Sequence, residues 1–389
     1  TQGYSSAASD VYKRQELKKV VLIPDSFKGT LSSAQICDIM EQNVKKHFPE
    51  CEVVKIPVAD GGEGSVNCFL TAAGGEKRKV IVKNPYMEDM EAFYGILPDK
   101  TAVIEMAACA GLPLVENRPN PEMTTTYGVG QLMLDAVEHG CKKIVVGLGG
   151  SCTNDAGAGA AAAVGVEFFD KDGEKLIPTG GTLGKVAKIS MENMDERIKS
   201  AQIITMCDID NPMYGKSGAA YIFGPQKGAD DEMVQRLDAN LRKFAERIQT
   251  EIGKDISNIH GGGAAGAMGA GMVAFFDSKL QMGIETVLDI VKFDELIQGA
   301  DLIFTGEGKM DSQSLRGKVV IGVGKRAKRQ DIPVVVVTGD AEEVEDAYDM
   351  GISAVFSTNR VARDFSVIRY KSKEYMEVTM DLSLIHISE

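Results

Sequence analysis

A glycine-rich stretch between residues 147 and 159 carries the strongest chemical signal in this sequence. It reads Gly-Leu-Gly-Gly-Ser-Cys-Thr-Asn-Asp-Ala-Gly-Ala-Gly, follows an apolar run and leads into an alanine-rich segment. Glycine lets the backbone approach a ligand and adopt positive φ, and the free N–H groups of a helix start favour bound anions. The pattern therefore predicts an anion cradle, with these candidate phosphate ligands: Gly149, Gly150, Ser151, Thr153 and Asn154.

The same stretch also has a simpler interpretation. A tight strand-to-helix turn uses glycine too, and Asn154 or Asp155 would then cap the helix. We count Asp155 among the candidate substrate ligands, because its carboxylate could orient a hydroxyl group, and keep helix capping as the alternative.

Four further apolar runs end in polar loops, and we expect all five runs to be buried strands of a parallel sheet. Apolar, β-branched runs of this length are typical of strands that are covered on both faces. In open α/β sheets, ligands bind beyond the carboxyl ends of the strands. The five polar loops should therefore line the floor of one cleft. The four further runs are 20–23, 203–207, 302–304 and 334–337.

The loops beyond these strands supply candidate ligands for a small anionic substrate. Ser26 and Lys28 follow the first run, although a loop lysine often pairs with a neighbouring aspartate instead. Lys309 follows the run that begins near residue 302. Glu63 lies among glycines beyond a second strand, where a charge at a helix start is the alternative. Lys227, within Pro-Gln-Lys-Gly, is a further candidate for binding phosphate.

Aspartates in the same loops are candidates for proton transfer and for metal binding. Asp60, Asp208 and Asp311 are the candidate proton acceptors. Asp208 and Asp210 are also candidate ligands of Mg²⁺, which prefers oxygen donors. The Asn-Pro pair that follows them allows an ordinary turn as the alternative.

Composition narrows the class of protein. The 389 residues predict two or three domains, and the net charge of −13 argues against a general binder of nucleic acid or anionic membranes. We find no apolar run near the roughly 20 residues that span a bilayer and no secretory signal. Seven scattered cysteines without a Cys-x-x-Cys pair indicate reduced thiols. We expect a cytoplasmic protein, and the sequence leaves a homodimer open.

The order of the elements predicts an α/β fold with a doubly wound, Rossmann-like parallel sheet, interrupted by a second α/β domain. Strand and helix patterns alternate over residues 17–80 and again over 291–381, whereas residues 81–290 carry more glycine and shorter strands. We expect Ser32 and Gln35 to form a capping box, and 231–252 to form a long amphipathic helix. Residues 1–16 and 382–389 resemble translated sequencing adaptors, so we interpret both as non-native tails.

Three common catalytic motifs are missing from the sequence. It has no Gly-x-x-x-x-Gly-Lys-[Ser/Thr] loop, no Gly-x-Gly-x-x-Gly after the first strand and no Gly-x-Ser-x-Gly elbow. The remaining aspartates, glycines and isolated lysines suit phosphoryl transfer. In such reactions the protein positions two anions, and Mg²⁺ and lysine neutralise charge.

Six motifs in this order resemble the bacterial glycerate kinase family, type I (the glycerate 2-kinase branch), from about residue 17 to 381. The resemblance implies ATP-dependent phosphorylation of D-glycerate to 2-phosphoglycerate with Mg²⁺, and a Rossmann-like domain split around an inserted one. The chain departs from the family after about residue 364, where a longer closing helix is usual. The motifs begin at Pro24, Ala59, Gly147, Gly224, Gly261 and Thr305.

Other functions remain open at this point. A kinase of a related hydroxy acid would give the 3-phosphate instead. An NAD-dependent oxidoreductase of a small hydroxy acid is an alternative, against which the missing dinucleotide fingerprint counts. A non-catalytic sensor of a small acid would need fewer carboxylates at the strand ends than this chain offers.

Overall fold

The chain forms two compact units in the computed structural model, which describes residues 17–58, 64–311, 314, 318–342, 345–359 and 365–388. One, the split unit, contains residues 1–59 and 287–389, and the other, the inserted unit, contains 60–286. The second boundary is close to the expected join at 290. The first boundary lies at 59 rather than 80, because the segment between them pairs and packs within the inserted unit.

The split unit is built on one sheet of five parallel strands in the order β14-β13-β12-β1-β2. Counted along the chain within this unit, the order is 2-1-3-4-5, which is a doubly wound arrangement. The buried valines and isoleucines of the apolar runs form the central strands, as the sequence predicted. The strands are β1 (Lys19–Pro24), β2 (Glu52–Lys55), β12 (Leu302–Met310), β13 (Val334–Ala341) and β14 (Ala354–Ser357).

Helices cover both faces of this sheet. The chain passes from β1 to β2 in one direction and from β12 to β13 in the other, and right-handed crossovers therefore place their helices on opposite faces. The helix α1 (Ser33–His47) begins with the predicted capping box of Ser32 and Gln35, which is confirmed. The other helices are α10 (Gly283–Ile290, across the boundary), α11 (Phe293–Leu296), α12 (Val319–Lys328), α13 (Asp346–Asp349), α14 (Phe365–Ile368) and α15 (Ser372–Ser388).

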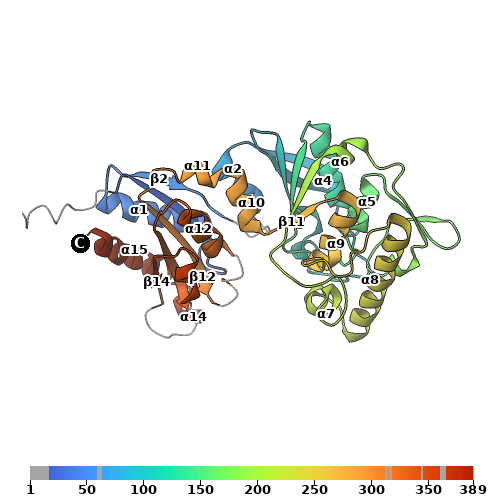
Figure 1. The fold of residues 1–389 in the computed structure, drawn as a ribbon. Helices are drawn as coiled ribbons and strands as arrows, with labels where there is room; N and C mark the ends of the chain where they lie inside the picture. Colours follow the sequence, from blue (N-terminus) through green and yellow to red (C-terminus); the bar gives the residue numbers. More distant parts are fainter. Residues whose placement is uncertain are drawn as a thin grey trace, which may run out of the picture. The chain divides into compact units, whose positions relative to one another are not determined.

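The C-terminal segment, for which the sequence predicts a non-native tail, is helical in the structure. Residues 382–388 continue α15, which lies beside α1 (Figure 1). Leu384, Met380 and Met376 are fully buried in the core that α15 shares with α1 and the sheet. The apolar residues of this segment therefore complete a helix that covers the sheet. Residues 1–16 lie outside the described residues.

The inserted unit is built on a mixed six-stranded sheet in the order β11-β10-β6-β5-β4-β3. The four strands from β11 to β5 are parallel, and β4 and β3 are antiparallel. A small sheet of β7, β8 and β9 adjoins the core. The strands are β3 (Glu76–Lys83), β4 (Asp89–Ile96), β5 (Thr101–Glu105), β6 (Lys143–Gly147), β7 (Glu167–Phe169), β8 (Lys175–Leu176), β9 (Lys188–Ser190), β10 (Gln202–Met206) and β11 (Lys279–Gln281).

A cluster of three phenylalanines ties the helices of this unit to the small sheet. Phe168 of β7, Phe244 of α8 and Phe275 of α9 are buried, with ring centroids 5.7–6.2 Å apart. The predicted helix 231–252 is confirmed as α8. The helices are α2 (Ser65–Ala73), α3 (Ala107–Ala110), α4 (Tyr127–Glu138), α5 (Ala158–Ala163), α6 (Glu196–Ser200), α7 (Ala219–Phe223), α8 (Asp231–Ile252) and α9 (Ala264–Phe276), with 3₁₀ turns η1 (Leu112–Val115), η2 (Leu183–Lys185) and η3 (Pro225–Lys227).

The expectation that all five polar strand ends share one sheet is wrong. The strands β1, β12 and β13 belong to the sheet of the split unit, whereas β6 and β10 belong to that of the inserted unit. The apolar runs marked buried strands but could not show which strands pair. Among the described residues, no helix combines the length and apolar character needed to cross a bilayer.

Candidate functional site

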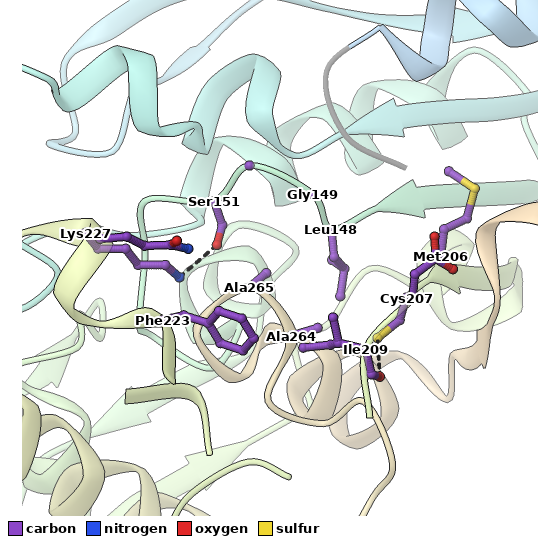
Figure 2. A pocket seen from close by; sticks show the side chains of 13 residues that line it. Leu148, Gly149, Ser151, Met206, Cys207, Ile209, Phe223, Lys227, Ala264 and Ala265 are labelled. Atoms are coloured by element: carbon purple, nitrogen blue, oxygen red, sulfur yellow. Dashed lines mark hydrogen bonds between the residues drawn. The ribbon is translucent and has the colours of Figure 1, made fainter. Parts of the chain in front are cut away.

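The predicted anion cradle lies at the carboxyl end of β6 and lines a cavity in the inserted unit. The cavity has a volume of about 230 Å³. Figure 2 shows side chains that line it. Gly150 in its wall has a φ of +75°, a conformation that glycine adopts without strain. The turn after β6 forms one wall of the cavity. The other walls come from the end of β10 and the loop after it, from the end of α7, from η3 and from the start of α9. The lining residues are Leu148, Gly149, Gly150, Ser151, Met206, Cys207, Asp208, Ile209, Phe223, Gln226, Lys227, Ala264 and Ala265.

Lys227 is a buried cation that contacts the glycine turn. Its Nζ donates to the Ser151 hydroxyl at 2.8 Å (Figure 2). It also donates to the Thr153 carbonyl oxygen at 2.7 Å. Only 2% of the residue is exposed, and burial lowers the pKa of its ammonium group to about 8. An anion in the cavity would compensate for this burial, because opposite charge favours the ionised form.

The start of α9 is strained where it meets the glycine turn. Ala265, Gly266 and Ala267 all have left-handed backbone conformations, with φ of 53°, 65° and 68°. A Cβ atom at Gly266 would lie 2.0 Å from the Thr153 carbonyl oxygen, so only glycine allows this approach. Non-glycine residues pay energy for such conformations, and this strain is concentrated at ligand sites. The strained segment therefore supports a binding role for the cavity.

Asp208 lies at the edge of the cavity, where β10 ends. It is exposed, and its Oδ1 accepts a hydrogen bond from the Gly283 backbone N–H at 2.7 Å. Asp210 is also exposed but does not line the cavity. Among the described residues, no three His, Cys, Asp or Glu side chains gather as a metal-binding group. The two aspartates could thus hold a cation only together with ligand oxygens.

The hydrogen bonds of Asp155 fit the alternative interpretation, in which this residue caps a helix. Its side chain is fully buried, and Oδ2 accepts hydrogen bonds from the Thr126 N–H at 2.7 Å and the Thr126 hydroxyl at 2.8 Å. Gly157 and Gly159 also donate their N–H groups to this carboxylate. Burial raises the pKa of Asp155, and the hydrogen bonds from Thr126 oppose that rise. These contacts join the starts of α4 and α5 and leave the carboxylate surrounded by protein.

Thr153 and Asn154 stand apart from the other cradle candidates. Neither lines the cavity, and both are fully buried. The Thr153 hydroxyl and both polar atoms of the Asn154 side chain have no hydrogen-bond partner among the described residues. Buried polar groups are rarely left unpaired, so these side chains remain candidates for a ligand or a bound water.

A second group of predicted residues gathers in the split unit, between β1 and β12. This is the point where the strand order reverses, which is the usual ligand position in a doubly wound sheet. The Asp25 N–H donates to the Gly306 carbonyl oxygen at 2.8 Å and fixes the loop with Ser26 and Lys28 beside β12. Lys309 extends from β12, 2.6 Å from Glu342 and 4.0 Å from Asp311.

The sequence reasoning missed two buried glutamates, one at the end of a strand and one inside a strand. Glu105, at the end of β5, accepts the Val66 N–H at 2.6 Å and the Gly64 N–H at 3.2 Å, and so caps α2. Glu307, in β12, is also buried. Both follow apolar β-branched runs, and Glu307 is flanked by glycines, a signal that could have identified it. The predicted residues Asp60 and Glu63 lie outside the described residues, so the clustering of Asp60 with Lys28 and Lys309, which the shared cleft floor predicts, stays a prediction.

Comparisons with known proteins agree over nearly the whole chain. A family model described as the glycerate kinase family matches residues 20–384. The chain is 44% identical to a glycerate kinase of Bacillus cereus over 93% of its own length and 96% of the relative. It is 42% identical to the glycerate 2-kinase of Escherichia coli, with 87% and 90% of the two chains covered.

A solved structure shows the same fold. The crystal structure of a Salmonella typhimurium LT2 protein, provisionally assigned as glycerate kinase 2, superposes with a TM-score of 0.84 at 37% identity. The match covers 95% of this chain and 98% of that one. By sequence and by fold, this chain belongs to the glycerate kinase family of ATP-dependent kinases that phosphorylate an alcohol group.

Proposed function

We propose that this chain transfers the γ-phosphoryl group of ATP to the 2-hydroxyl of D-glycerate, giving 2-phosphoglycerate and ADP. Family membership supports the reaction class, and the name of the Escherichia coli relative specifies a 2-kinase. The observation that carries the proposal furthest is Lys227, a buried ammonium group held against a glycine turn in a cavity. A buried cation at such a turn favours a bound anion, as phosphoryl transfer requires.

The cavity of the inserted unit is the proposed nucleotide site. Backbone N–H groups at Gly149 and Gly150 would bind phosphate oxygens, while the Ser151 hydroxyl and Lys227 bind from the side. The pocket is smaller than the usual 300–1,000 Å³ of ligand sites, with about 230 Å³. This volume fits a phosphate chain better than a whole nucleotide, so the base and ribose would extend out of it.

Magnesium is expected with the nucleotide. Mg²⁺ is commonly held by one or two carboxylates together with substrate phosphates, and it keeps several waters. The exposed carboxylates of Asp208, at the cavity edge, and Asp210 fit that donor set. When bound, the ion would neutralise charge on the phosphates. The roles of the chain itself are to hold the phosphates, to orient them and to supply the cation of Lys227.

Glycerate binding is proposed for the strand-order reversal of the split unit. Lys28 and Lys309 would attract the substrate carboxylate, and the Ser26 hydroxyl would donate a hydrogen bond to it. Lys309 already pairs with Glu342 at 2.6 Å, so it would exchange a partner or bind glycerate at the rim. Asp60, Asp208 and Asp311 remain the sequence-predicted candidates for proton acceptance, and Glu63 and Asp155 the further substrate candidates.

An ADP-release assay over a panel of acceptors tests this function. With ATP and Mg²⁺, D-glycerate should be phosphorylated, and L-glycerate, lactate and glycerol much more slowly, because glycerol lacks the carboxylate. Phosphorus NMR should place the phosphate on the 2-oxygen. Exclusive 3-phosphoglycerate would identify the other branch, and glycerol turnover as fast as that of D-glycerate would contradict carboxylate recognition. Reduction of NAD⁺ by the acid without ADP release would favour an oxidoreductase.

Cellular location and oligomeric state stay predictions. The cysteines are all free, and six of the seven are buried, in keeping with a reducing compartment. We expect a cytoplasmic enzyme whose partners are the two small substrates. Light scattering in solution will show whether it is a homodimer.

A further inference from the structure

Glu307 occupies the point in the split unit where the strand order reverses. It lies in β12, which pairs with β1 on one side and with β13 on the other. The two neighbouring glycines allow the surrounding backbones to come close. A Cβ atom at Gly306 would lie 2.1 Å from the Val337 carbonyl oxygen, and one at Gly308 would lie 3.4 Å from the Phe27 Cα. Glu307 therefore lies between two glycines beside which neighbouring backbone comes close.

The backbone on both sides holds this position firmly. The Glu307 carbonyl oxygen accepts the Thr338 hydroxyl of β13 at 2.9 Å. The Gly306 carbonyl oxygen accepts the Asp25 N–H at 2.8 Å, which ties the loop with Ser26 and Lys28 to the same strand. The glutamate side chain and the proposed glycerate ligands thus start from a shared rigid frame.

The carboxyl group of Glu307 is buried without its full set of hydrogen bonds. Only 5% of the residue is exposed, and its Oε1 has no hydrogen-bond partner among the described residues. A carboxylate with an unpaired buried oxygen carries a large desolvation cost. Its retention beside candidate substrate ligands indicates that a ligand group supplies the missing partner.

The charged neighbours of the Glu307 carboxyl group come from three segments. Burial is the largest cause of the raised pKa of Glu307, which lies at about 7. A hydrogen bond with the Ser314 side chain and the charge of Lys318 before α12 oppose the rise, whereas Asp25 after β1 and Asp311 after β12 add to it. From β13, the residue paired with Glu307 is the uncharged Thr338, whose hydroxyl donates to the Glu307 backbone carbonyl oxygen. A carboxyl group that titrates near the working pH is suited to general-base catalysis.

We infer that Glu307 is the proton acceptor for the substrate hydroxyl that is phosphorylated, an inference that rests on the proposed function. The hydroxyl O–H bond breaks, and its proton moves to a Glu307 carboxylate oxygen. The freed electron pair forms the new O–P bond. The bond between the γ-phosphorus and its bridging oxygen breaks, and ADP leaves with that electron pair. The proton returns to solvent after the product has left.

Glu307→Gln tests the inference, because it keeps the shape of the side chain and removes the base. We expect kcat to fall by about 10²–10⁴-fold, the usual loss for a general base, while the KM for D-glycerate changes little. In the wild type, kcat/KM should fall below about pH 7 as Glu307 becomes protonated. This fall of kcat/KM at low pH, the acid limb of the profile, should be absent from the residual activity of Glu307→Gln. Glu307→Asp, which keeps the acid, should retain the limb and part of the rate.

Asp135→Asn is the matched control, since it also neutralises a partly buried carboxylate, one that pairs with Arg78 and Tyr94. It should lower the melting temperature and leave the acid limb unchanged. A Glu307→Gln protein that keeps more than about a tenth of kcat, or that keeps the acid limb, overturns the inference. If Glu307→Gln does not fold, the pH profile of the wild type still decides: a profile without the acid limb overturns the inference. Absence of glycerate-dependent ADP release from the wild type would instead contradict the proposed function.

Discussion

Single residues in this protein carry charges that the surrounding fold makes unusual. Lys227 and Glu307 are both buried, and burial moves both pKa values toward neutrality from opposite directions. Asp155 is buried as well, but five backbone or hydroxyl donors, from Thr125, Thr126, Gly157 and Gly159, satisfy it. Asp155 is therefore a structural carboxylate, whereas Lys227 and Glu307 are candidates for contact with a ligand.

Nucleotide binding should therefore take up a proton through Lys227. Because burial lowers its pKa to about 8, the free protein loses this proton above that pH, and a bound phosphate restores it. Calorimetric titration with ADP at about pH 9, in two buffers of different ionisation enthalpy, should show net proton uptake. Lys227→Met should abolish the uptake and weaken binding by about tenfold or more.

Lys243→Met, which removes an exposed lysine of α8, serves as the control and should leave both quantities unchanged. The same pKa shift predicts the pH dependence of stability. The unfolded chain keeps the Lys227 proton up to about pH 10.5, so this group should make the free energy of unfolding rise as the pH rises above about 8. Proton-neutral binding of ADP would contradict the placement of phosphate beside Lys227.

At the scale of elements, the C-terminal helix shows how packing decides what belongs to a fold. The sequence of residues 382–389 resembles an adaptor, yet 382–388 form the last part of α15. Leu384 is fully buried against the sheet and α1, while Leu382 on the same helix is 42% exposed. Burial of one helix face, rather than the origin of the residues, determines whether they stabilise the unit.

The two leucines provide a matched pair of substitutions. Leu384→Ala should lower the free energy of unfolding by about 2–5 kcal/mol, the usual cost of a cavity in a core. Leu382→Ala should lower it by less than about 0.5 kcal/mol, as at other exposed sites. Urea denaturation of the two variants measures both. Equal, small effects would show that the segment after residue 381 is not packed in solution.

On the scale of the whole molecule, the chain divides its candidate chemistry between two sheets. The cavity with Lys227 and Asp208 belongs wholly to the inserted unit, and Glu307 and Lys309 belong to the split unit. Each group lies at the carboxyl ends of parallel strands, where a doubly wound sheet leaves room for ligands. The two substrates are therefore expected to bind first to different units.

Hydrogen exchange can test this division. Mg²⁺ with ADP should protect the backbone amides of residues 148–154 and 264–267, because these segments surround the cavity. D-glycerate alone should protect residues 304–310 and leave the cavity segments unchanged. Protection by ADP that is confined to β12 would contradict the assignment, as would protection by glycerate that is confined to the glycine turn.

Local sequence patterns predicted the buried strands, the glycine turn, the capping box of α1 and the family. Apolar runs, Ser32 with Gln35, and the Gly147–Gly159 stretch all report local physics, since burial, capping and backbone freedom depend on near neighbours in the chain. Three other features appear only in the folded chain: β1 and β6 lie in different sheets, Thr126 donates hydrogen bonds to Asp155, and Glu307 is buried with one oxygen unpaired among the described residues. Strand pairing and desolvation depend on contacts between residues far apart in the chain, and a single sequence does not record those contacts.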